Sequence, residues 1–151
     1  MTWLEYAVLG VFAVAAAIFG FRVWLNRLRQ SALDDSDRAV SGKRIVLREA
    51  SANLIGMRSQ GLGAVRGNGV LTLTERSLQF VMWLPRRSFS IPLDSVGSVE
   101  SPTSFMGRSK LRELLQVNFA DERGEADAAA WVVRDLQAWT GALNERAGHR
   151  S

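Results

Sequence analysis

The chain has 151 residues, of which 47% are hydrophobic and 23% charged, with no cysteine and a single histidine, His149. One domain with an additional segment fits this length, and the composition excludes general disorder. The lack of cysteine excludes disulfides, thiolate zinc sites and thiol nucleophiles. The 19 Lys and Arg exceed the 15 Asp and Glu, for a net charge of +4.

The N-terminal segment is long and apolar enough to cross a membrane. Tyr6–Phe21 carries no charge over 16 residues, and the apolar span extends over 23 residues, from Trp3 to Leu25. A crossing of a hydrocarbon layer about 30 Å thick needs about 20 residues. We predict a transmembrane anchor over residues 1–25, apolar all round rather than amphipathic. The residues expected at its two membrane interfaces are Trp3, Tyr6, Phe21, Arg22, Trp24, Arg27 and Arg29.

Two other interpretations of this segment are open. A cleaved signal peptide would need a positive n-region, which MTWLE lacks, and cleavage at residues 13–15 would leave an apolar mature end. A buried core helix without a polar face would need a much larger soluble body around it. Arginines follow the span and none precedes it, so the positive-inside rule predicts an outside N-terminus, a cytoplasmic domain and a single-pass location in the cell membrane.

The position of the charge argues against a nucleic-acid partner. Residues 1–33 and 34–67 each carry a net charge of +2, whereas residues 68–151 hold ten bases and ten acids. A neutral domain body lacks the clustered basic face that nucleic-acid binding needs. The excess of basic residues therefore lies in the segments next to the predicted membrane span.

Residues 26–42 are predicted to be a basic flank and polar linker. QSALDDSDRAVSG, residues 30–42, is poor in large apolar side chains and rich in Ser and Asp. Its acidic cluster could bind a hard cation, but an EF-hand loop beginning at Asp35 would place Val40 where glycine is required. A solvated linker is the favoured interpretation.

From residue 43 onward the hydrophobic pattern has the two-residue period of strands. Pro92 indicates an edge strand or a strand end. Short strands of this kind with turns between them predict an antiparallel sheet or barrel. The predicted strands are 43–49, 70–74, 77–83, 88–93, 96–99, 115–119 and 128–133.

The last predicted element is a helix over residues 134–146. Leu136, Trp139 and Leu143 form a stripe at helical spacing, and Asp135 is available as an N-cap or first-turn acid. A helix with this stripe can close the open end of a barrel by burying it in the core. Residues 147–151 are expected to be a tail.

This order of elements resembles the pleckstrin-homology-like superfold, in particular its GRAM-like and bacterial versions. The resemblance covers about residues 43–146 and is carried by residues 69–80, 86–100 and 114–119 and by the terminal helix with Trp139. It implies a PH-like antiparallel barrel of six or seven strands with a C-terminal helical cap. One transmembrane α-helix followed by this mostly-β domain is the predicted fold class. Lipid-binding family members carry a basic signature on the first strand pair, which Lys43, Arg44 and Arg48 do not reproduce.

A group of basic and apolar residues is the candidate contact surface. Arginine offers a bidentate fork to phosphate, so basic loops with exposed apolar tips could bind anionic headgroups. A surface that is solvated, or paired with Asp94, Glu100 and Glu113, is the alternative. The candidate lipid or partner contacts are Arg86, Arg87, Phe105, Met106, Arg108, Lys110 and Arg112.

Other motifs give no sign of catalysis. In the glycine cluster 61–69 the third glycine of a dinucleotide fingerprint comes one residue late and a strand follows, so we predict turns, with Asn68-Gly69 a hairpin-type pair. Glu122, Glu125 and Asp127 flank a glycine in a turn, where acids usually face water. We expect no enzyme, cofactor or metal site.

The functional hypothesis is a membrane-anchored, non-catalytic interaction or scaffolding module. Its cytoplasmic domain would bind a protein partner of unknown identity, for example by strand addition at a sheet edge. The alternative is recognition of anionic lipid headgroups through the basic loops.

Overall fold

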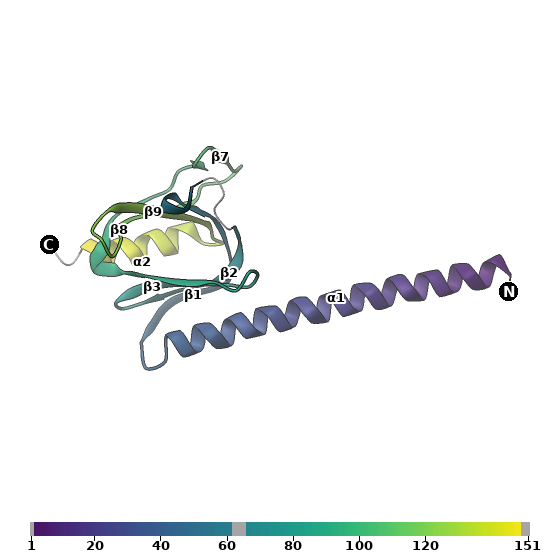
Figure 1. Ribbon diagram of the computed structural model, residues 1–151. Helices are drawn as coiled ribbons and strands as arrows, with labels where there is room; N and C mark the ends of the chain where they lie inside the picture. Colours follow the sequence, from purple (N-terminus) through teal and green to yellow (C-terminus); the bar gives the residue numbers. More distant parts are fainter. Residues whose placement is uncertain (1, 62–65, 149–151) are drawn as a thin grey trace.

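The computed structural model describes residues 2–61 and 66–148. A long helix, α1 (Trp3–Ala39), extends from a β-domain that ends in a second helix, α2 (Leu136–Gly148) (Figure 1). The Glu5 carboxylate accepts a hydrogen bond of 2.9 Å from the backbone N–H of Thr2 and so holds the first turn of α1.

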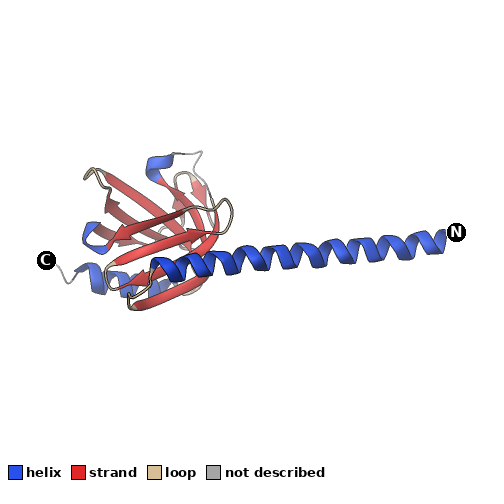
Figure 2. Ribbon diagram, turned by 60° about the horizontal axis from the view of Figure 1, so that its bottom comes forward, coloured by secondary structure: helices blue, strands red, loops and turns tan. Residues whose placement is uncertain are grey.

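The domain consists of one curled antiparallel sheet, which Figure 2 shows from below, and a small hairpin. Seven strands form the sheet in the order β4–β3–β2–β1–β9–β8–β5, and β6 pairs with β7. The predicted strands are all present, and β4, which ends at Pro92, lies at one edge as predicted. The strands are β1 (Ile45–Met57), β2 (Gly67–Thr74), β3 (Ser77–Met82), β4 (Ser88–Pro92), β5 (Val96–Glu100), β6 (Ser104–Phe105), β7 (Arg108–Ser109), β8 (Leu115–Ala120) and β9 (Ala126–Val132), with short 3₁₀ turns η1 (Arg58–Gln60) and η2 (Leu93–Ser95).

β1 is longer than the predicted strand 43–49 and joins the two halves of the sheet. Its first part pairs with β2 and its last part with β9. The pairing shifts between Glu49 and Ala52 and again between Leu54 and Gly56, and such irregularities let a strand bend. The shifts also interrupt the alternation of apolar residues, which is why residues 50–57 gave no strand pattern.

The predicted stripe of α2 closes the core. Trp139 and Leu143 are buried and Leu136 packs beside them in the main apolar cluster. The Asp135 carboxylate accepts a hydrogen bond of 3.1 Å from the N–H of Ala138, which confirms the predicted N-terminal cap. The helix continues to Gly148, two residues into the predicted tail.

The prediction of a polar linker over residues 26–42 is wrong for its first fourteen residues, because α1 continues unbroken to Ala39. Ala32 and Ser36 are buried against the outer face of β2 and β3, where Ala32 packs with Val70 and Val81. The hydroxyl of Ser36 lies 3.1 Å from that of Thr72. Small side chains one turn apart allow the helix to approach the sheet closely, while the aspartates lie toward its more exposed sides.

The docked helix makes β2 and β3 buried on both faces. Leu71, Leu73 and Phe80 point into the core, while Val70 and Val81 lie beneath α1. The last part of α1 is therefore a structural element of the domain, and the predicted boundary at residue 43 divides one packed unit.

We predicted that Gly69 would lie in a hairpin turn, but it lies inside β2. There it is paired with Met82 of β3 and Ala52 of β1. A Cβ at Gly69 would meet the carbonyl oxygen of Val81 and lie 2.6 Å from the ring of Phe80. Only glycine allows this close approach. Of the other predicted turn glycines, Gly61 has a positive φ of 68°, and residues 62–65 lie outside the described residues.

Candidate functional site

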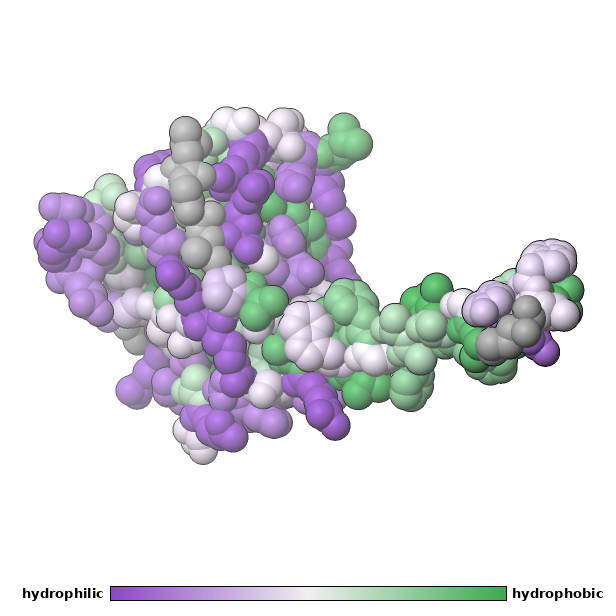
Figure 3. All heavy atoms as spheres, turned by 45° about the vertical axis from the view of Figure 1, so that its right-hand side comes forward, coloured by the Kyte–Doolittle hydropathy of each residue, from purple (hydrophilic) through white to green (hydrophobic). Residues whose placement is uncertain are grey.

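The apolar part of α1 is not buried in the described domain. Its most apolar 18-residue window has a mean hydropathy of 2.1, and none of that window is buried. Large side chains such as Phe12 and Phe19 are about 70% exposed, at 69% and 71%. Figure 3 shows this stretch as an apolar arm that projects from a largely hydrophilic domain. It is therefore not the core helix of this domain.

The predicted interface residues lie toward the two ends of this arm. Trp3 and Tyr6 are exposed near its start, and the rings of Phe21 and Trp24 stack at 5.8 Å near its end. The helix rises about 32 Å from Trp3 to Trp24, which is close to the thickness of a hydrocarbon layer. Arg22, Arg27 and Arg29, which follow the uncharged run, are also exposed.

The predicted basic contacts of the β3–β4 turn have different surroundings. Arg86 forms an ion pair of 2.8 Å with Asp35 of α1, so its guanidinium reaches back toward the docked helix. The alternative of an acid-paired surface is right for this residue, but its partner comes from α1 rather than from Asp94, Glu100 or Glu113. Arg87 lies exposed beside it.

The prediction that Phe105 is an exposed apolar tip is wrong. Its ring is 4% exposed and packs with Ile55 and Leu114. The turn between β6 and β7 has positive φ at both central residues, 51° at Met106 and 75° at Gly107, as in a tight two-residue hairpin turn. Met106 is half-buried against the same cluster.

Arg108 and Arg112 hold this region against the sheet. Nη1 of Arg108 donates to the carbonyl of Ile55 at 2.9 Å, and Nη2 of Arg112 donates to the carbonyl of Val133 at 3.0 Å. Lys110 instead is exposed and lines an open hollow of about 480 Å³ together with Arg66 and Arg108. Lys110 and Arg66 are therefore the cations of this region that can reach an anion.

Three residues of these loops were missed by sequence reasoning. Arg66 enters the hollow from the start of β2, and the exposed apolar tips are Leu84, at 56%, and the fully exposed Leu111. One signal could have found the leucines. Each is a single large apolar residue that belongs to no strand pattern and lies in a loop rich in charged residues or proline.

Comparison with known proteins identifies the fold. No protein-family model and no curated protein sequence matches this chain. The C-terminal domain of an unknown protein from Leishmania infantum superposes with a TM-score of 0.53 at 18% identity, over 78% of this chain and 96% of that one. The Vps36 N-terminal PH domain gives 0.51 at 18% identity, over 72% and 81%. A chain of the 8S snRNP assembly intermediate gives 0.50 at 12% identity, over 70% and 80%.

The domain has a PH-like fold. Its seven-stranded antiparallel sheet and terminal helix match that architecture. Identities this low show the arrangement of the chain alone.

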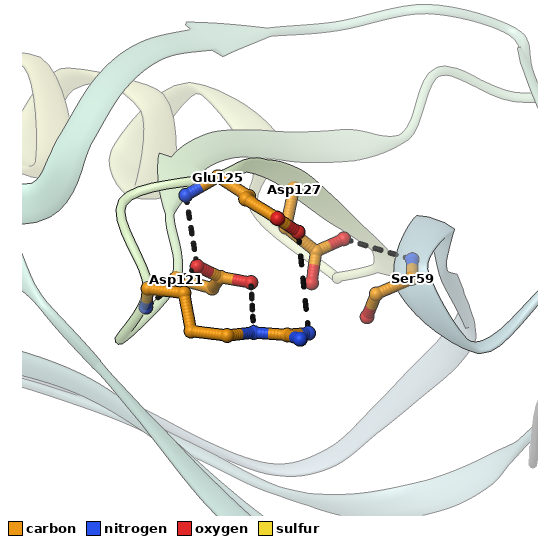
Figure 4. A network of polar contacts seen from close by, with 5 residues as sticks. Ser59, Asp121, Glu125 and Asp127 are labelled. Atoms are coloured by element: carbon orange, nitrogen blue, oxygen red, sulfur yellow. Dashed lines mark hydrogen bonds and ion pairs between the residues drawn. The ribbon is translucent and has the colours of Figure 1, made fainter.

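The acidic hairpin of the PH-like domain has a structural role (Figure 4). The Asp127 carboxylate is 5% exposed and accepts hydrogen bonds from the N–H groups of Ser59 and Ala128, at 2.9 and 2.8 Å. Asp121 accepts from the N–H groups of Arg123 and Glu125, both at 2.9 Å. These bonds fasten η1 to β9 and close the β8–β9 turn. Within residues 2–61 and 66–148 no three acidic or histidine side chains gather as a metal site would require, and His149 lies outside them.

Proposed function

We propose that the chain is a single-pass membrane protein whose PH-like domain is a non-catalytic binding module on the cytoplasmic side. The observation that carries this proposal is the continuity of α1. One helix is apolar and unburied from Trp3 and is docked on the domain from Ala32 onward. A bilayer would cover the exposed apolar part, whereas the docked part would hold the domain next to it.

The arginine distribution supports the orientation. Arg22, Arg27 and Arg29 follow the apolar run, whereas no Lys or Arg precedes it. Positive residues near the end of a span favour the cytoplasmic side.

The absence of cysteine provides a direct test of this topology. Single cysteines at Thr2 and Arg76 would be exposed to a membrane-impermeant maleimide on opposite sides of the membrane. In intact cells stripped of any outer wall, we expect labelling at Thr2 alone, with Arg76 labelled only after permeabilisation. Full extraction of the chain by alkaline carbonate would contradict the anchor, and labelling of Arg76 in intact cells would contradict the orientation.

A protein partner is the favoured ligand, and the edge strand β5 is the proposed docking point. β5 ends the sheet and pairs only with β8 among the described strands. Gly97 and Ser98 of this strand are exposed, and β5 contains no proline. An extended segment of a partner could add a strand here through main-chain hydrogen bonds.

A photoreactive residue at Gly97 should crosslink to a discrete protein in native membranes, whereas one at Arg76 should not. Equal crosslinked products at both positions would contradict β5 as the docking point.

The hollow beside Lys110 supports a second candidate, the binding of an anionic headgroup. Arg66 and Lys110 line it and are exposed, and phosphate oxygens pair well with such cations. The full chain in phosphatidylcholine nanodiscs would be titrated with glycerol phosphate. Binding that weakens in Lys110→Glu but not in Arg76→Glu would support this candidate, and no measurable binding would exclude it for this probe.

A further inference from the structure

We infer that the PH-like domain touches the same bilayer that α1 crosses, through Leu84 of the β3–β4 turn and Leu111 of the β7–β8 loop. The leucines would lie among the headgroups, with Arg87 and Lys110 against lipid phosphates. This inference rests on the proposed membrane anchor and adds a second, peripheral contact to it. The surface formed by Leu84, Arg87, Lys110 and Leu111 is called the loop surface below.

The contacts of α1 show which residues of β2 and β3 lie beside which residues of the helix. Ser36 faces Thr72, and one turn earlier Ala32 packs with Val70 and Val81. Four helical residues advance about 6 Å and two strand residues about 6.6 Å. β2 and α1 therefore run nearly alongside each other in the same direction. The start of β2 and the end of β3 point toward the apolar arm.

Counting onward from Val81 places the β3–β4 turn at the membrane. From Ala32 to Leu25, where the predicted span ends, the helix rises about 10 Å. From Val81 to Leu84 the chain advances at most about 10 Å. Leu84 thus lies between the levels of Ala32 and Leu25, and the headgroup layer extends about 5–8 Å beyond the hydrocarbon. A domain fixed to α1 in this way would hold the turn close to the headgroup layer.

The second loop lies at the same end of the domain. A Cβ at Gly67 would lie 3.3 Å from the carbonyl oxygen of Leu84, so the start of β2 adjoins the turn. Gly67 also lines the hollow that Lys110 lines from the other side. Leu111, directly after Lys110, is fully exposed.

The side chains of this end suit a lipid surface, whereas those of the opposite end do not. Leu84 is 56% exposed and is followed closely by Arg87, and Leu111 lies between Lys110 and Arg112. An apolar tip flanked by cations can enter the headgroup layer while the cations meet lipid phosphates. At the other end of β2 and β3 the turn consists of Glu75 and Arg76 and offers no apolar tip.

Cysteine-linked NBD probes in the otherwise cysteine-free full chain test this arrangement. The chain would be reconstituted in vesicles of phosphatidylcholine and phosphatidylserine that contain lipids with a shallow nitroxide. Single cysteines would be placed at Leu84 and Leu111, at Ser109 as a reporter that leaves both leucines intact, and at Arg76 as the matched control. A further cysteine at Val14 with a deep nitroxide would report the anchor itself.

We expect blue-shifted, strongly quenched fluorescence at Leu84, Leu111 and Ser109 and neither effect at Arg76. The quenching at Ser109 should be lost in the double variant Leu84→Asp, Leu111→Asp, which should fold normally because both side chains are exposed. Quenching at Val14 without quenching at Ser109 would overturn the loop contact while the anchor stands. Equal quenching at Arg76 would overturn the orientation, and no quenching at Val14 would overturn the anchor and the inference together.

Discussion

The two halves of α1 form one helix but meet different surroundings. Residues 3–25 are mostly apolar and all of them are exposed, whereas residues 26–39 are mostly polar and include the part that docks on the sheet. Along this helix the apolar residues are thus the exposed ones, and the buried residues lie in the polar half. The difference shows that a polar segment can be the packed one when its few small side chains fall on one face.

The docked half combines three kinds of contact. Ala32 fills the space between Val70 and Val81, the hydroxyls of Ser36 and Thr72 meet in a buried site, and Asp35 pairs with Arg86 at the rim. The apolar contact excludes water, while the polar contacts satisfy groups that burial would otherwise leave without partners. Each contact can be removed separately, so the contribution of each to the docking can be ranked.

Charges in the first half should have the largest effect. In the double variant Val14→Asp, Ile18→Asp, two acids lie one turn apart at the centre of the predicted span. Each is expected to cost about 2.5–3.5 kcal/mol of insertion free energy. Carbonate extraction should then release most of the chain from the membrane fraction.

The matched control for that variant is Gln30→Asp, an exposed site in the second half of the same helix. It should remain in the membrane fraction like the unmodified chain. Full retention of the double variant would mean that the first half is not embedded in lipid.

A larger side chain at Ala32 should weaken the docking of the second half of α1 without acting on the first half. Ala32 is fully buried between α1 and the sheet, so Ala32→Phe should overpack this site and weaken the docking by about 1–3 kcal/mol. The barrel core should survive because its main cluster does not include Ala32. Hydrogen exchange of the full chain in nanodiscs should show faster exchange over residues 28–39 but not in β8 or β9.

Gln30→Phe, two residues earlier and exposed, is the control and should leave the exchange of residues 28–39 unchanged. If Ala32→Phe also left it unchanged, the juxtamembrane half would not depend on the Ala32 contact.

Most of the domain could be predicted from the sequence because its signals are local. Alternation marked the strands, the Leu136, Trp139 and Leu143 stripe marked α2, and Pro92 marked an edge. The docking of α1 could not be predicted in this way. Thr72 and Gln79 on the outer face of the sheet are polar, as solvent-exposed residues usually are. The sequence does not distinguish a buried hydroxyl from an exposed one.

The candidate surface was predicted only in part, for a related reason. Arg87 and Lys110 are exposed as expected, but Phe105 turns inward and Leu111 outward. The direction of Phe105 depends on a two-residue turn at Met106 and on contacts with β1, which lies far away in the sequence. No local pattern contains that information.

The hydroxyl pair of Ser36 and Thr72 should have an intermediate effect. Ser36→Ala leaves the buried Thr72 hydroxyl without this partner, at an expected cost of about 1–2 kcal/mol in docking free energy. The double variant Ser36→Ala, Thr72→Val removes both polar groups and should recover most of that loss. Thermal unfolding of the full chain in detergent, arranged as a double-mutant cycle, measures the coupling. Strictly additive effects would show that the two hydroxyls do not interact.

Loss of the Asp35–Arg86 ion pair should have the smallest effect. The two side chains are 36% and 49% exposed, so water and salt screen their attraction. Exposed pairs of this kind contribute about 0–1 kcal/mol. Arg86→Gln should therefore shift the unfolding midpoint only slightly, and the shift should disappear at high salt. Arg87→Gln, at the neighbouring exposed position, is the matched control and should not change the midpoint. A large, salt-independent loss in Arg86→Gln would mean that the docked half depends on this pair more than on its buried contacts.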